Sequence, residues 1–266
     1  MKRSDNTIFL ILLVIIGAAG AIGYYWQQAD QAVVDPASAP ADDVAVEMPP
    51  AGPVHPLDLS LPASEDRELV PLPPLDDLDA YLKLELVSIF GRALDELLAN
   101  EALIDRLVAT VDNLPHSRIG ERIRPVGRLA STFSVEIENT DDSLIISPAN
   151  FDRYTFLIDA LQYADINSIV DLYRRYYPVF QKSYVQLGYP DGYFNDRVIE
   201  VIDHLLETPT PEQPIRLVSP HVLYEFADAD LEALSSGQKL MLRIGDQHAA
   251  ALRNVLIAFR ARIASQ

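Results

Sequence analysis

The chain has 266 residues, and 21 Lys and Arg against 39 Asp and Glu give it a formal net charge of −18. A charge of this sign repels nucleic acid and anionic lipid headgroups, so we expect no nucleic-acid partner. The chain contains no cysteine, which excludes disulfides, thiol catalysis, thiolate zinc sites and lipid attachment to a cysteine.

The N-terminal region carries an uninterrupted apolar run from Ile8 to Trp26. As a helix this run spans about 29 Å, which matches the hydrocarbon core of a bilayer at ~30 Å. Lys2 and Arg3 precede the run and acidic residues follow it, so the positive-inside rule predicts a cytoplasmic N-terminus at residues 1–7 and an exported remainder. The alternative is a cleaved signal peptide with Ala19-Gly20-Ala21 as its cleavage site. The length of the run and its aromatic outer end favour a retained single-pass transmembrane helix over residues 8–26.

Residues 27–74 contain ten of the nineteen prolines and no aromatic residue. A segment of this composition cannot bury enough apolar surface to offset the entropy that ordering costs. We therefore predict a disordered Pro-rich linker, whose reach lies between about 40 Å as a coil and about 150 Å as polyproline II.

Beyond the linker, the apolar residues recur at helical spacing. A helix is predicted over residues 78–89, with the Asp76-Asp77 pair as its cap and Gly91 as its end. Asn100 is predicted to cap a second helix over residues 103–111.

The hydrophobic period then changes to two. Apolar and polar residues alternate over residues 133–138 and again over 143–147, and the polar residues 139–142 supply a turn between them. This pattern predicts an antiparallel β-hairpin, with an extension by residues 123–126. Further short strands are predicted at residues 216–218 and 222–224.

The remainder of the chain returns to helical periodicity, with Pro178 and Gly188 as expected breaks. The predicted helices cover residues 151–163, 166–177, 193–206, 228–234, 238–243 and, as a final amphipathic helix, 249–263. The fold class expected for residues 75–266 is therefore mainly α (α+β), a globular helical domain with a small antiparallel hairpin or sheet.

The densest chemical feature is a group of eight aromatic residues between positions 173 and 194. Aromatic faces beside Asp and Asn side chains suit the recognition of a protein or a glycan, because the rings stack while the polar groups orient the ligand. The candidate contact residues are Tyr189, Asp191, Tyr193 and Asn195. The alternative is that most of these rings belong to the core, and that Asp191 and Asn195 only form a turn and a helix cap.

A second candidate is a polar stripe of Asp196, Glu200 and His204, which stand four residues apart on one predicted helix. Carboxylates and a histidine at this spacing can bind a divalent metal or divide the roles of acid and base. The alternative is an ordinary solvated face, because the stripe lies opposite the apolar side of the helix. No H-E-x-x-H motif accompanies the stripe, so we assign no metal, cofactor or catalytic residue.

Residues 236–239 match S-x-x-K, the nucleophile motif of penicillin-recognising enzymes. The companion K-T-G and S-D-N elements are absent from the sequence. Ser235 or Ser236 as a helix N-cap explains the same residues without any catalysis.

Several segments of the chain carry a further signal: residues 108–115, 188–197, 201–206, 223–227 and 236–239. Together they are similar to a bacterial family catalogued as domain of unknown function 3014. The resemblance covers roughly residues 75–263, preceded by the same kind of anchor and linker. It implies a Gram-negative envelope protein and points to the region from Tyr189 to His204, and it brings no activity with it.

These patterns together predict an inner-membrane protein with a cytoplasmic N-terminus. Its periplasmic domain is expected to be a non-enzymatic binding or scaffolding module that contacts an envelope protein or a glycan. The alternative is an envelope hydrolase that acts on peptidoglycan with carboxylates such as Asp196 and Glu200. A third class, an assembly factor for an envelope machine, differs from the first only in its partner.

Overall fold

The computed structural model describes residues 52–60, 71–72, 77–127, 133–138, 143–220 and 224–264. The predicted anchor at residues 8–26 and most of the predicted linker lie outside these residues. Among the described helices, none combines the length and the apolar character that crossing a bilayer demands.

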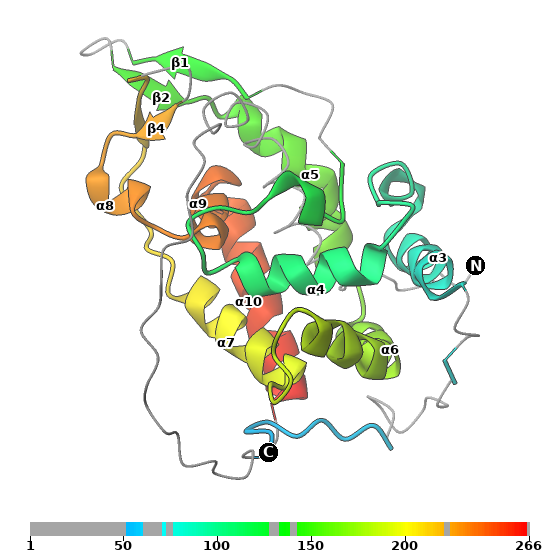
Figure 1. Cartoon of the computed structure of the whole chain (residues 1–266). Coiled ribbons are helices and arrows are strands. Elements are labelled where there is room, and N and C mark those ends of the chain that lie inside the picture. Colours follow the sequence, from blue (N-terminus) through cyan, green and yellow to red (C-terminus); the bar gives the residue numbers. More distant parts are fainter. Residues whose placement is uncertain are drawn as a thin grey trace, which may run out of the picture.

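The domain is mainly helical, as predicted, and α10 (Asp246–Ile263) runs through its centre in Figure 1. This helix contacts the helices α5, α6, α7 and α9, while α4 packs on α3, α6 and α7. The other helices are α3 (Leu78–Phe90), α4 (Leu103–Asn113), α5 (Ala149–Gln162), α6 (Ile166–Gln186), α7 (Phe194–Leu206), α8 (Ala229–Glu232) and α9 (Ser236–Arg243), with 3-10 turns η2 (Arg92–Leu94) and η3 (Glu121–Ile123).

Within the described residues, one apolar core joins the helices α3, α4, α5, α6, α7, α9 and α10, whereas α8 contributes to a second, smaller cluster. In α10 the buried residues Leu252, Leu256, Phe259 and Ile263 follow one another at intervals of three or four, which places them on one side of the helix. Burial of such side chains contributes about 1.5–3 kcal/mol each, so the core rather than helix propensity stabilises these elements.

The helix α6 differs from its prediction, because it continues through Pro178 to Gln186. Pro178 is exposed, so its ring meets solvent, although the missing N–H still removes one helical hydrogen bond. On the other face, Tyr176, Phe180 and Tyr184 are buried before and after the proline. Their packing outweighs the local break. The helix therefore ends at Gln186 instead of at residue 177, shortly before the predicted break at Gly188, which has a φ of +113°.

The start of α4 is also different from the prediction, which made Asn100 its cap. The N–H of Ile104 donates to Asp79 Oδ1 of α3 at 2.9 Å. The side-chain oxygen of Asn100 instead accepts from Lys83 Nζ at 2.6 Å. The predicted cap is wrong, because a carboxylate from a neighbouring helix takes that place.

The sheet within the described residues is four-stranded and antiparallel, in the order β1 (Val135–Ile137), β2 (Leu144–Ile146), β3 (Arg216–Val218) and β4 (Glu225–Phe226). The predicted hairpin is confirmed, with Val135 opposite Ile146. One face of the sheet packs on α8 and α9 through a second, smaller apolar cluster that includes Leu217, Phe226 and Leu231.

Two predicted strands are corrected. Residues 123–126 do not extend the hairpin, because residues 121–123 form η3 and Val126 makes an isolated bridge to Leu98. The last strand falls at Glu225–Phe226 rather than at 222–224. Of that predicted range only Tyr224 lies among the described residues, and it is not in a strand.

Candidate functional site

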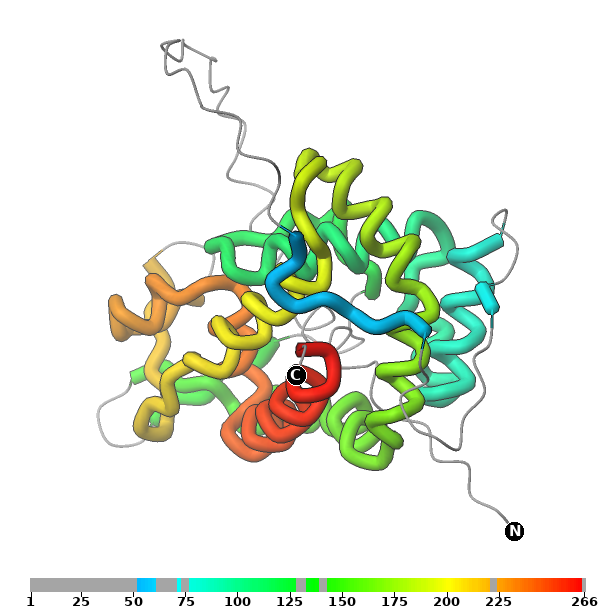
Figure 2. Tube along the Cα trace, turned by 90° about the horizontal axis from the view of Figure 1, so that it is seen from below, coloured from blue at the N-terminus to red at the C-terminus, as the bar shows by residue number. Residues whose placement is uncertain are grey.

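Residues 52–60, which the sequence analysis placed in a free linker, lie against the domain. We call them the strap. In Figure 2 the strap is the blue segment, which crosses the start of α7 and passes close to the C-terminal end of α10. We call the surface beneath it, built around Asn195 and Asp196, the strap site.

The strap site holds the main chain of the strap. Asp196 Oδ2 accepts from the N–H of Val54 at 2.9 Å, and Oδ1 accepts from the N–H of His55 at 2.7 Å. Asn195 Nδ2 donates to the carbonyl oxygen of His55 at 2.8 Å. These contacts hold two successive N–H groups and one carbonyl of the backbone, which bends at Val54 and His55 so that both N–H groups face the same carboxylate. Asp196 lies in the first turn of α7, where the helix dipole favours a carboxylate.

The side chains of the strap alternate in burial. Pro53, His55 and Leu57 are partly buried against the domain, whereas Val54 and Pro56 between them are exposed. Leu57 packs on the main apolar core. Alternate side chains of the strap therefore face the surface that it covers, although its backbone bends at Val54 and His55.

Asn195 is fully buried and joins four parts of the chain. Besides the strap, its Nδ2 donates to the carbonyl of Ile263 at the end of α10, at 2.9 Å. Its Oδ1 accepts from the hydroxyl of Tyr173 in α6, at 3.0 Å. Burial raises the pKa of Tyr173 well above its ordinary value, so this hydroxyl remains a donor. Asn195 therefore satisfies a carbonyl that the end of α10 leaves without a helical partner.

The four predicted contact residues do not form one surface. Asn195 is at the strap site, Asp191 is exposed in the preceding turn, and Tyr193 is half-buried just before α7. Tyr189 stacks on Tyr184, with ring centroids 4.7 Å apart, and its hydroxyl donates to Asp112 Oδ2 at 3.2 Å. Most of the aromatic cluster is core, as the alternative interpretation held. The buried members are Tyr173, Tyr176, Phe180, Tyr184 and Phe194.

The predicted polar stripe has a separate partner for each of its members. Asp196 holds the strap, Glu200 accepts from Arg197 Nη1 at 2.8 Å, and His204 Nε2 lies 2.8 Å from Ser235 Oγ. The structure therefore does not bring the three side chains to one centre. Across the described ranges there is no group of three or more His, Asp and Glu side chains that could hold a metal ion.

One interaction that the sequence analysis missed is a buried ion pair between α4 and α7. Arg197 Nε donates to Asp112 Oδ1 at 2.9 Å, and Arg197 Nη2 donates to the backbone carbonyl of Asp112 at 2.6 Å. Asp112 is only 5% exposed. One signal in the sequence could have revealed this pair. Asp112 is an acidic residue directly after the apolar positions of the helix predicted at 103–111.

The S-x-x-K match is a helix start. Ser235 Oγ accepts from the N–H of Gln238 at 3.2 Å, and the side chain of Gln238 bonds back to Ser235, which forms a capping box. Lys239 pairs with Glu232 of α8. A Cβ on Gly237 would lie 2.6 Å from Leu205 Cδ2, so this glycine allows α9 to approach α7 closely.

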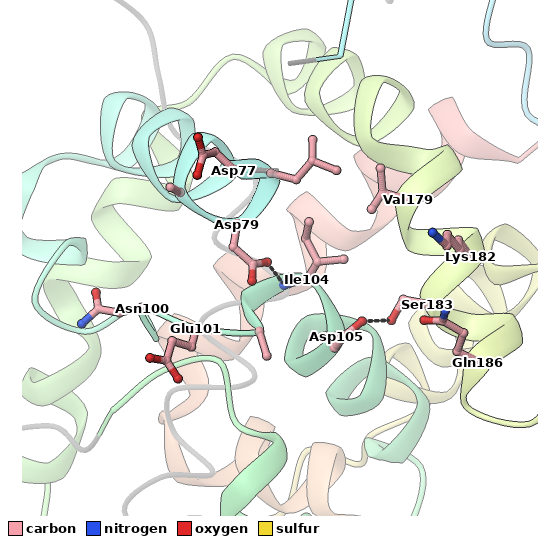
Figure 3. A pocket seen from close by; sticks show the side chains of 13 residues that line it. Asp77, Asp79, Asn100, Glu101, Ile104, Asp105, Val179, Lys182, Ser183 and Gln186 are labelled. Atoms are coloured by element: carbon pink, nitrogen blue, oxygen red, sulfur yellow. Dashed lines mark hydrogen bonds between the residues drawn. The ribbon is translucent and has the colours of Figure 1, made fainter. Parts of the chain in front are cut away.

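An open polar pocket of about 490 Å³ lies between the N-terminal ends of α3 and α4 and the second half of α6 (Figure 3). Two acidic residues of its lining connect these helices through hydrogen bonds. Asp79 holds the N–H of Ile104, and Asp105 Oδ1 accepts from Ser183 Oγ of α6 at 2.6 Å. Lys182 stands among these carboxylates in the same lining.

Comparisons with known proteins place the chain in a family. No curated protein and no solved structure matches it. A family profile matches residues 103–260, which run from the start of α4 almost to the end of α10 and include Asn195 and Asp196 but not the strap. Because this match covers more than half of the chain, the protein belongs to the family described as Protein of unknown function (DUF3014).

Proposed function

We propose that this protein is a non-enzymatic binding or scaffolding module of the bacterial cell envelope. A transmembrane helix at residues 8–26 anchors it in the inner membrane, and the helical domain lies in the periplasm. The apolar run, the basic residues ahead of it and the acidic composition beyond it support this placement.

The strap site is the observation that supports a binding role. Its Asp196 and Asn195 side chains are arranged for two N–H groups in succession and the carbonyl that follows them. A polypeptide that bends at these two residues presents this pattern, as the strap does, whereas a glycan does not. The partner that this site fits is therefore a protein with a segment that bends in this way.

The partners of the acidic residues favour binding over the alternative of a peptidoglycan hydrolase. Asp196 accepts two backbone N–H groups, and Glu200 is paired with Arg197. A catalytic acid and base must act at one reacting centre. These two carboxylates have separate partners and do not share such a centre. An assembly factor for an envelope machine is also a scaffolding protein, and it differs from the proposed module only in the identity of its partner.

Site-specific crosslinking in intact cells tests the binding role. A photoreactive residue replaces the exposed Asp191, four residues before Asn195, and in a control replaces the exposed Glu207 after α7. The expected result is a crosslinked envelope protein from position 191 only, which disappears when Asp196→Ala is added. The same crosslinks from both positions, unaffected by Asp196→Ala, would contradict the proposal.

The proposed location has its own test. An alkaline phosphatase fused after Gln266 is expected to be active, since this reporter folds only outside the cytoplasm. A cytoplasmic reporter that is active at the same position would contradict the envelope location.

A further inference from the structure

The strap occupies its site through contacts that another chain can reproduce. Between described residues, two N–H groups and one carbonyl of the strap backbone are held by Asp196 and Asn195, and Leu57 packs beneath. None of these hydrogen bonds involves a side chain of the strap. A competing segment therefore needs a backbone that bends with two adjacent N–H groups on one side, and a suitable apolar residue, rather than a matching sequence.

The strap site is held in place by contacts that do not involve the strap. Asn195 is fixed by the hydroxyl of Tyr173 and the carbonyl of Ile263. The N–H of Phe194 donates to Gln181 Oε1 at 2.7 Å, which fixes the start of α7 where Asp196 lies. Because these bonds persist when the strap leaves, the site stays organised for a second occupant.

The strap is also lightly held. Three hydrogen bonds to the domain and the partly buried Pro53, His55 and Leu57 oppose the conformational entropy that ordering nine residues costs. Val54 is 75% exposed, so its side chain adds little contact. Such a balance permits exchange with a segment from another chain.

Resting on the proposed function, we propose that the strap is an intramolecular competitor, which a partner protein displaces with a segment of its own that bends at the two donor residues. The segment presents two successive N–H groups, so neither of those positions is proline. An apolar side chain follows two residues after the second of them, in the place of Leu57. At the position of His55 the site requires no hydrogen bond from Nδ1 of the side chain, since this buried atom has no hydrogen-bond partner among the described residues.

The experiment uses the full chain and a fluorescent peptide with the sequence of residues 52–60. Val54→Pro with His55→Pro removes both N–H donors and leaves the strap site untouched. Val54→Ala is the matched control, since it keeps both donors. Deletion of residues 52–60 is a second way to uncover the strap site. We call this chain and the double-proline variant the released chains.

The peptide is expected to bind both released chains about tenfold more tightly than wild type or Val54→Ala, because a strap on a short connection competes at an effective concentration in the millimolar range. Adding Asp196→Ala to a released chain is expected to abolish binding. If the peptide bound all these chains with equal affinity, the strap would not be a competitor, although the chain would still have a peptide-binding site. No binding to any chain would also contradict the proposed function.

Discussion

At the level of single residues, two neighbours at the start of α7 have different tasks. Asn195 is buried and joins α6, α10 and the strap, so its replacement affects the fold as well as the site. Asp196 is only partly buried, and its side-chain hydrogen bonds to other described residues go to the strap backbone. Asp196 is therefore the position at which the site can be changed with the least effect on the core.

Arg197, the next residue, offers a comparison between a buried and an exposed partner. Arg197→Met leaves the buried Asp112 carboxylate without its cation and is expected to lower the free energy of unfolding by about 3–5 kcal/mol. Glu200→Gln removes the other partner, whose side chain is 67% exposed, and is expected to cost less than about 1 kcal/mol. Urea unfolding measures both, and equal losses would refute the ranking.

Arg153 in α5 is a buried cation whose Nε, Nη1 and Nη2 have no hydrogen-bond partner in the described part of the chain. It lies 5.7 Å from the ring centroid of Tyr154, which compensates only part of the cost. Arg153→Met is expected to raise the free energy of unfolding by about 1–3 kcal/mol. Arg92→Met, at an exposed position, makes the same charge change and should alter it by less than about 0.5 kcal/mol. A clear loss of stability in Arg153→Met would contradict this account.

At the level of elements, periodic apolar patterns predicted the helices well, because burial of one face decides whether such a segment is helical. The failures come from interactions between elements. Asn100 has the residue type of a cap, yet Asp79 on another helix caps α4. Residues 123–126 have apolar character, yet they bridge to Leu98 instead of joining the sheet.

The candidate site was predicted only in part, because it too depends on an interaction between distant parts of the chain. The sequence located Asn195 and Asp196 in the right region, since a turn signature followed by an amphipathic helix marks a helix start. It could not show that residues 52–60 return to that helix start, because the contact spans about 140 positions and depends on backbone groups that every residue carries. Composition alone indicated a free linker there.

Pro178 gives a test of the packing argument for α6. Pro178→Ala restores an N–H at an exposed position of the helix and is expected to raise the free energy of unfolding by about 2 kcal/mol. Pro190→Ala, in the exposed turn before α7, is expected to lower it by about 0.5–1 kcal/mol, because the unfolded chain gains freedom. Chemical unfolding of both variants measures whether each substitution raises or lowers the free energy of unfolding. A loss in Pro178→Ala would show that the proline shapes the helix in a way that the core requires.

At the level of the whole molecule, buried tyrosines connect stability to alkaline pH. Burial and then the charge of Asp112 raise the pKa of Tyr184 to about 12, and burial also raises the pKa of Tyr154 and Tyr173. The unfolded chain loses these protons near pH 10 and the folded chain only at higher pH. Above pH 10 the folded state therefore binds more protons, so its stability falls as the pH rises toward 12.

The thermal unfolding midpoint between pH 8 and pH 11.5 measures this effect. It is expected to decline from about pH 10, and Tyr184→Phe should make the decline shallower. Tyr163→Phe, at an exposed position, should leave the decline unchanged. A midpoint that stays constant up to pH 11.5 would contradict the assignment.

Under the proposed function, an anchored envelope module binds a polypeptide segment at the strap site and covers that site with a segment of its own chain. The strap, which precedes the matched family region, then controls access to Asp196. A protein partner and the strap then compete for the same two hydrogen-bond acceptors.

Amide hydrogen exchange at single-residue resolution in the full chain tests this arrangement most directly. The N–H groups of Val54 and His55 are predicted to exchange at least about tenfold more slowly than those of an unstructured peptide, and Asp196→Ala is predicted to remove that protection. Exchange of both amides at the rate of a free peptide in the wild-type chain would contradict the account.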